Sequence, residues 1–116
     1  MEPVSIHQAV EEHLAKAQQS PQGRSSHTLV GGRDRVLRQT VVALKGGEKL
    51  AEHEAPGEAT LMVLRGRVSL GTSSGEQEVG THELAEIPME RHDLTAHEDS
   101  VVLLTVAKAV GNPAHA

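Results

Sequence analysis

The chain has 116 residues and a formal net charge of −5, which suits one domain and excludes a two-domain enzyme. It contains no Phe, Tyr, Trp or Cys, which excludes stacking platforms for single-stranded nucleic acid, aromatic cages, disulfides and thiolate metal sites. The acidic balance offers no basic face for a phosphate backbone, so we expect no nucleic-acid partner. Eight histidines are the one compositional excess, and they could serve as ligands, proton carriers or a pH-sensitive surface.

Residues 1–23 predict a helix followed by a linker. Ser5 and Gln8 have the spacing of a capping box, and apolar side chains recur at three- and four-residue steps over residues 5–19. A turn-forming cluster at residues 20–23 ends the helix. Because we find no leader sequence and no long apolar run, we expect a cytoplasmic protein without a membrane partner.

Residues 24–110 predict a single β domain. After a polar stretch through Arg35, short apolar runs alternate with turn residues. The connections are too short for crossover helices, so the pattern predicts an all-β sandwich or barrel. Residues 111–116 are expected to form a flexible tail. The expected strands are residues 36–44, 59–64, 67–70, 77–79, 84–87, 92–96 and 100–107.

Some of these runs are apolar on both faces. In residues 59–64, for example, Leu61 and Val63 alternate with Met62 and Leu64. A small sandwich buries only its inner face, so the second apolar face needs another cover. The N-terminal helix can cover one patch and a second subunit another, and we therefore predict a homodimer.

The segment from Gly47 to Gly66 carries the most informative pattern. It resembles the first motif of the cupin superfamily, in which a Gly is followed by five residues, His-x-His, a Glu and a closing Gly. Gly47 and His53 keep the five-residue gap, and Gly66 stands at the closing position. Residues 80–92 are similar to the second cupin motif, with Pro88 followed by His92.

The resemblance covers about residues 36–107 and implies a cupin-like double-stranded β-helix, a jelly-roll barrel with a short N-terminal helix. In that family, two His from the first motif, a carboxylate and one His from the second motif form a metal site. Strand alternation aims both His of a His-x-His pair at one face, and mixed nitrogen and oxygen ligands suit Fe, Mn, Ni, Cu or Zn.

This chain departs from that ligand set. The second His of the pair is Ala55, and the Glu position falls on Ala59, with Glu58 one residue away. One residue in a strand means the opposite face unless a bulge intervenes. Two protein ligands rarely hold a divalent ion, so we expect no cofactor. The alternative is Zn, Fe, Mn or Ni held by His53, His92 and a rearranged Glu58 or Glu52.

Arg38 and Gln39 lie in the first long strand, which borders the cavity in cupin-like folds. Alternation directs one of them inward, and an inward guanidinium could clamp a carboxylate or a phosphate. If Leu37 faces inward, Gln39 shares its face and Arg38 does not. The expected ligand pocket comprises Arg38, Gln39, His53, Ala55, Ala59 and His92. The remaining histidines are expected to be solvated: His7, His13, His27, His82, His97 and His115.

Three functions remain open. The favoured one is a small barrel that binds a small molecule and is non-catalytic or only weakly metal-binding, with no catalytic residue assigned. The second is a metal-dependent enzyme of the dioxygenase or isomerase type that uses His53 and His92. The third is a ligand-sensing regulatory protein, since cupin-like barrels sense ligands in some transcription factors. The depleted ligand set favours the first.

Overall fold

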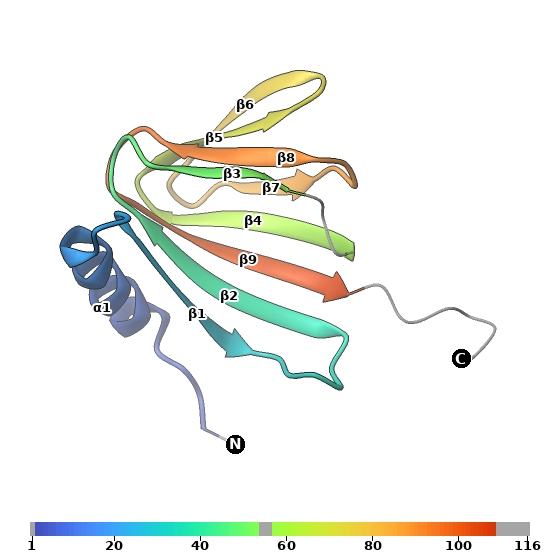
Figure 1. Ribbon diagram of the computed structural model, residues 1–116. Helices are drawn as coiled ribbons and strands as arrows, with labels where there is room; N and C mark the ends of the chain where they lie inside the picture. The colour runs from blue at the N-terminus through green and yellow to red at the C-terminus, as the bar shows by residue number, and fades with distance from the viewer. Residues whose placement is uncertain (1, 54–56, 109–116) are drawn as a thin grey trace.

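The computed structural model describes residues 2–53 and 57–108, apart from the side chain of His53 (Figure 1). The expected tail at residues 111–116 lies outside the described residues. Within them, no helix is both long enough and apolar enough to cross a membrane. The elements are α1 (Ile6–Gln19), β1 (Arg24–Val30), β2 (Leu37–Leu44), β3 (Lys49–His53), β4 (Gly57–Arg65), β5 (Arg67–Thr72), β6 (Gly75–Gly80), β7 (Leu84–Ile87), β8 (His92–Ala96) and β9 (Ser100–Lys108).

The strands form two facing antiparallel sheets, as Figure 1 shows. One sheet has the order β1-β2-β9-β4-β7, and the other has the order β3-β8-β5-β6. Neighbours such as β2 and β9 are far apart in the sequence but pair along their whole length. The all-β expectation is confirmed, and the core lies between the two sheets.

Two strands, β1 and β3, were not expected from the sequence. β1 has apolar residues only at its end, Leu29 and Val30, and it is an edge strand that pairs with β2 alone. β3 is also an edge strand, and its Leu50 packs against the core. Edge strands expose one side of their backbone and much of their side-chain surface, so a hydrophobic pattern marks them weakly.

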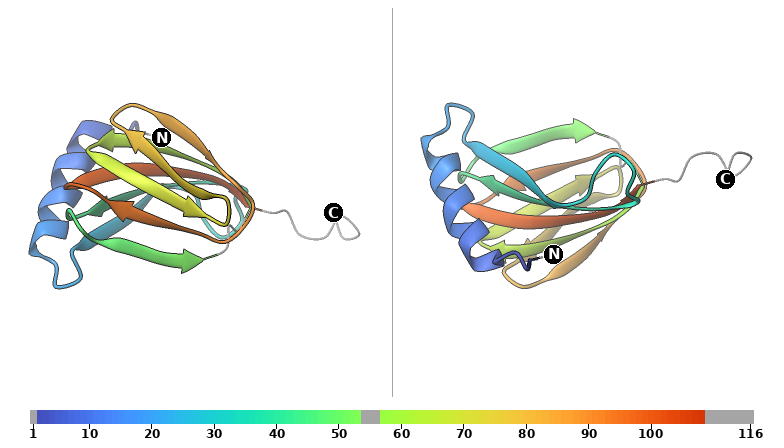
Figure 2. Two further views of the ribbon diagram at one scale, coloured as in Figure 1. Left: turned by 90° about the horizontal axis from the view of Figure 1, so that it is seen from above. Right: turned by 90° about the horizontal axis from the view of Figure 1, so that it is seen from below.

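Helix α1 covers part of the outer face of the larger sheet, as expected. Ser5 caps the helix, and its hydroxyl accepts a hydrogen bond from the Gln8 N–H at 3.1 Å. The helix crosses the strands at one end of the sandwich, where it packs against β1, β2 and β9 (Figure 2). Val10 and Ala17 are buried there against Val41 and Val101. The second apolar face of these strands is therefore partly covered from within the chain.

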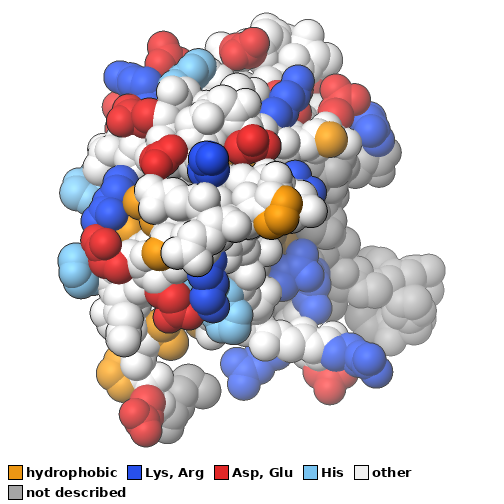
Figure 3. Space-filling model, turned by 60° about the vertical axis from the view of Figure 1, so that its left-hand side comes forward, with side chains coloured by type: hydrophobic (Ala, Val, Ile, Leu, Met, Phe, Trp, Pro, Cys, Tyr) orange, Lys and Arg blue, Asp and Glu red, His pale blue; other side chains and the backbone are white. Residues whose placement is uncertain are grey.

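Charged side chains of both signs are mixed on the surface around this helix. Arg65 pairs with Glu11 at 2.6 Å, and Lys16 pairs with Glu12 at 3.1 Å. On the face seen in Figure 3, acidic and basic side chains lie side by side and do not gather into a patch of one sign. This face therefore offers no basic surface for a phosphate backbone.

His13 is not solvated, contrary to the sequence expectation. It is 5% exposed, its Nδ1 lies 2.8 Å from the Ser25 hydroxyl, and its ring stacks on His27 with centroids 5.5 Å apart. The sequence could not reveal this burial, because β1 was not expected and supplies both neighbours. Burial lowers the pKa of His13 below its usual value, with Glu12 opposing that change and Lys16 and His27 adding to it.

The lowered pKa of His13 predicts a loss of stability in mild acid. As the pH falls below about 6.5, the unfolded chain takes up a proton at this residue more readily than the folded chain. The free energy of unfolding should therefore fall between pH 7.5 and 5.5, and His13→Gln should flatten that slope. Thermal melts across this range measure it, with exposed His7→Gln as the control. Equal slopes in wild type and His13→Gln would contradict the prediction.

Candidate functional site

One end of the barrel brings together side chains from four strands of the larger sheet. Arg38 near the start of β2 is the Cα partner of Val106 in β9, and Val106 is in turn the partner of Ala59 in β4. Ala59 pairs onward with Ile87, the last residue of β7. These four residues form one continuous row across the sheet, which we call the mouth row. It lies at the end of the strands opposite α1.

The mouth row faces the space between the two sheets. Val106, Ala59 and Ile87 all belong to the core cluster between the sheets. Because side chains alternate along a strand and Val106 is its partner, Arg38 faces inward as well. Its side chain is half-buried. The family resemblance suggested that a residue of β2 faces the barrel interior, and the register shows that Arg38, and not Gln39, faces inward.

Gln39 lies on the opposite face of β2. It shares the outer face with Val41, which packs under α1, and its amide donates to the Thr105 hydroxyl at 3.2 Å. Leu37 is also on this outer face, 46% exposed. Leu37 therefore does not face inward, so Gln39 does not face inward with it. Residues 41–44 are apolar on both faces, so the sequence alone could not reveal which face points inward.

His92 is the buried polar residue that begins β8 on the facing sheet. It is 6% exposed, and it alternates with Leu94 and Ala96, which belong to the core between the sheets. Its Nδ1–H donates to the Glu90 carbonyl at 2.9 Å, so a neutral ring carries its lone pair on Nε2. His92 is also the Cα partner of His53 across β3 and β8. Ala55 lies outside the described residues.

The segment that leads into His92 is braced by charged side chains. Glu90 accepts two hydrogen bonds from Ser73, one from the N–H at 3.1 Å and one from the hydroxyl at 2.7 Å. These bonds hold the pKa of the Glu90 carboxyl below its usual value. Arg91 donates to Glu52 at 3.0 Å, joining the segment to β3. No sequence signal marked these braces, because each joins loops or strands far apart in the chain.

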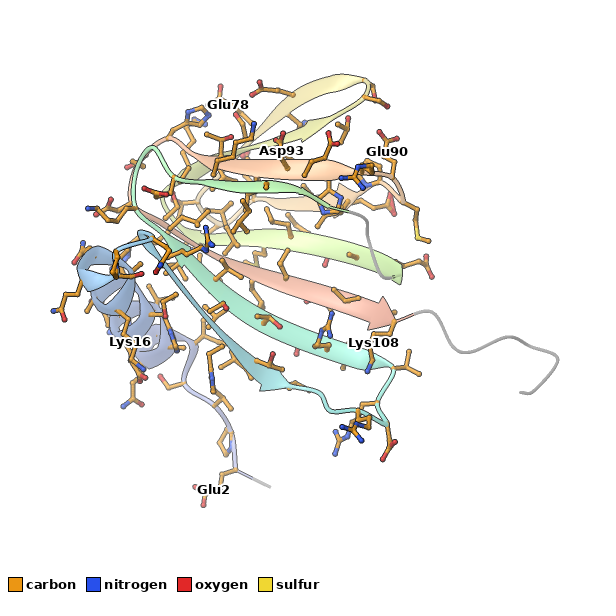
Figure 4. The ribbon with its side chains drawn as sticks, viewed as in Figure 1. Glu2, Lys16, Glu78, Glu90, Asp93 and Lys108 are labelled. Atoms are coloured by element: carbon orange, nitrogen blue, oxygen red, sulfur yellow. The ribbon has the colours of Figure 1, made fainter. Side chains whose placement is uncertain are left out.

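Charged groups lie on both sides of this end of the barrel. Figure 4 shows Lys108 at the end of β9 and Glu90 in the turn before β8, both at the end opposite Lys16 of α1. A surface cavity of about 440 Å³ at this end lies on the outer face of the larger sheet, where Leu37, Glu58 and Thr105 line it.

The described residues do not complete a divalent-metal site. Ala59, at the position of the cupin carboxylate, has no donor atom, and Glu58 is exposed on the opposite face of β4. The bulge that could turn Glu58 inward is absent, since β4 pairs with β9 residue for residue from Gly57 to Val63. Within residues 2–53 and 57–108, the side chains described include no group of three potential ligands among His, Asp and Glu.

Comparison with known proteins supports the fold rather than an activity. No protein-family model matches the sequence, and no curated protein matches it. A conserved Streptococcus pyogenes protein of unknown function superposes with a TM-score of 0.70 at 28% identity, over 79% of this chain and 80% of that one. The cupin domain of a transcriptional regulator from Enterobacter cloacae superposes with a TM-score of 0.64 at 11% identity, over 75% and 98% of the chains. The chain has the cupin fold.

Enzymes share this cupin fold too. Salicylate 1,2-dioxygenase from Pseudaminobacter salicylatoxidans superposes with a TM-score of 0.73 at 13% identity, over 86% of this chain and 33% of that enzyme. At such low identity the likeness concerns the fold alone. The cupin resemblance of residues 36–107 is therefore confirmed at the level of architecture, and the activity has to be argued from the site.

Proposed function

We propose that this cupin barrel binds a small organic molecule at its open end and does not catalyse a reaction. The observation that supports this most is the composition of the mouth row. Ala59 carries a methyl group at the position where the cupin motif has a carboxylate, and Val106 and Ile87 beside it are apolar. The proposed pocket retains polar groups in Arg38 and His92. An apolar row with few polar groups suits a small-molecule ligand better than a catalytic centre.

One observation favours a second candidate, a metal-dependent enzyme of the dioxygenase or isomerase type. The backbone pairing of His53 and His92 puts the two histidines on neighbouring strands. Two imidazoles alone make a weak site, because catalytic zinc, for example, has three protein ligands and a water. Any metal at this end of the barrel would therefore be held loosely.

Elemental analysis of protein purified without chelator separates these two functions. We expect well below one equivalent of transition metal, with the same content in His53→Ala and His92→Ala. His82→Ala is the control, because His82 lies in an exposed turn. A full equivalent that disappears in both His53→Ala and His92→Ala, but not in His82→Ala, would favour the enzyme.

A ligand-sensing role is the third candidate, and the Enterobacter cloacae regulator domain is its parallel. The described residues contain one helix, α1, and it is committed to covering the sheet. A sensor of this kind would therefore act through a separate DNA-binding partner. Co-purification of such a partner, released by a bound small molecule, would favour this role.

The uncovered part of the larger sheet supports a homodimer. One row on the outer face runs from Val41, under α1, through Leu103 and Met62 to Leu84. Leu84 is 67% exposed. A second copy of the chain would cover this apolar row, which fits the expectation drawn from strands that are apolar on both faces.

Leu84→Glu is expected to convert the dimer to monomers, because it puts a charge into the apolar contact. Light scattering coupled to gel filtration measures the change in mass. Val36→Glu is the matched control, since Val36 is 46% exposed but precedes the row. If the wild-type protein is a monomer, the homodimer proposal is wrong, and the ligand-binding proposal is unaffected.

A further inference from the structure

Two basic side chains face the open end of the barrel from neighbouring strands. Arg38 lies in the mouth row, and Lys108 is two residues beyond its partner Val106, on the same face of β9. Diagonal neighbours of this kind lie about 7–8 Å apart at Cα. The Lys108 ammonium donates to the Gly32 carbonyl at 3.0 Å, in the loop that precedes β2.

Among the described residues, Arg38 combines partial burial with the lack of an acidic partner. Arg65, Arg67 and Arg91 each lie within 4 Å of a glutamate: Glu11, Glu78 and Glu52, at 2.6, 3.4 and 3.0 Å. Arg24, Arg33 and Arg35 are exposed to solvent. Within the part of the chain that the structure describes, the half-buried Arg38 guanidinium makes no hydrogen bond and no ion pair. A partly desolvated cation without a counter-ion is unfavourable, and a bound anion would relieve that cost.

Three carboxylates near this end are directed elsewhere. Glu52 is paired with Arg91, Glu90 is held by Ser73, and Glu58 is exposed on the outer face. The chain as a whole carries a net charge of −5. At this end, however, the described charged side chains on the inner face of β2 and β9 are both basic: Arg38 and Lys108. The local field there therefore favours an anion and disfavours a divalent cation.

We propose that the ligand of this barrel is a small aliphatic carboxylate clamped by Arg38, an inference that rests on the proposed ligand-binding function. The planar guanidinium can donate two parallel hydrogen bonds to one carboxylate. The aliphatic body then lies along Val106, Ala59 and Ile87, the apolar residues of the same row. The replacement of the cupin carboxylate by Ala59 and the inward Arg38 in the same row convert a cation site into an anion site.

Two matched probes test this proposal: hexanoate and its neutral analogue hexanamide. Titrations followed by ¹H–¹⁵N correlation spectra report binding at the amide signals of Ala59 and Val106. We expect hexanoate to shift these signals and hexanamide to bind at least about tenfold more weakly, because only the carboxylate forms charge-assisted hydrogen bonds. Arg38→Gln should weaken hexanoate binding by a similar factor and leave hexanamide binding unchanged.

Two further variants act as controls. Arg35→Gln removes an exposed arginine of the loop before β2 and should bind hexanoate like wild type. Arg38→Lys keeps the charge but loses the paired donors, and should fall between wild type and Arg38→Gln. The spectra also report whether each variant is folded.

The outcomes separate this inference from the function on which it rests. Equal binding of both probes at Ala59 and Val106, unaffected by Arg38→Gln, would overturn the carboxylate clamp and leave the ligand-binding function standing. Absence of any shift at these residues with either probe would overturn both. Hexanoate-selective binding that Arg38→Gln weakens about tenfold and Arg35→Gln leaves unchanged would support both.

Discussion

Gly66→Ala is expected to destabilise the protein by about 4 kcal/mol, a large share of the stability of a domain of this size. Gly66 joins β4 to β5 with φ of +91°, in the left-handed region that L side chains avoid. A Cβ at this position would collide with the Ser100 hydroxyl and lie 2.6 Å from the Asp99 carbonyl oxygen. Both the backbone conformation and the close approach therefore require glycine.

Ser100 cannot move aside to relieve this collision. It is 1% exposed, and its hydroxyl accepts from the Arg67 N–H at 3.0 Å and donates to the Glu98 carbonyl at 2.7 Å. Moving it would break the hydrogen bonds that fix the start of β9 against the start of β5. A buried polar group left unsatisfied adds to the cost.

Gly47→Ala is the matched control for this prediction. Gly47 has nearly the same φ, +92°, but a Cβ there would meet nothing within 4 Å. Gly47→Ala should therefore lower the free energy of unfolding by only about 1–2 kcal/mol, the cost of the left-handed backbone conformation for an alanine. Urea unfolding of both variants gives the two values. Equal losses would show that the contact with Ser100 contributes nothing.

Leu61→Ala is expected to cost about 3 kcal/mol, the second largest effect. Leu61 is fully buried in the core between the sheets, one inward position further along β4 than Ala59. The chain has no aromatic side chain that could shift into the space left behind. The loss therefore includes both the transfer of the side chain and the cavity.

The effect of Leu61→Ala also shows whether the barrel interior is tightly packed below the mouth row. Val36→Ala, at a 46% exposed position, should change the free energy of unfolding by less than about 0.5 kcal/mol. If Leu61→Ala costs less than about 1 kcal/mol, the interior is loosely packed at that level. The ligand space would then extend deeper than the mouth row, and the proposed site would have to be enlarged accordingly.

Short-range patterns were sufficient to predict much of the fold. The Ser5 cap, the strand at residues 92–96 and the closing Gly66 are recognisable because each depends on neighbours only a few residues away. The edge strands β1 and β3 were missed because pairing with a distant partner, rather than their own composition, holds them in place. The burial of His13 followed from β1 and was missed with it.

By itself, the sequence determined the all-β architecture, the covering helix and the loss of a carboxylate at Ala59, because alternation and motif spacing are local properties of the chain. Only the tertiary structure decided that Arg38 rather than Gln39 faces inward, since β2 is apolar on both faces and its orientation depends on pairing with Val106. The mouth row likewise exists only through the register of four strands, and sequence order does not determine long-range register.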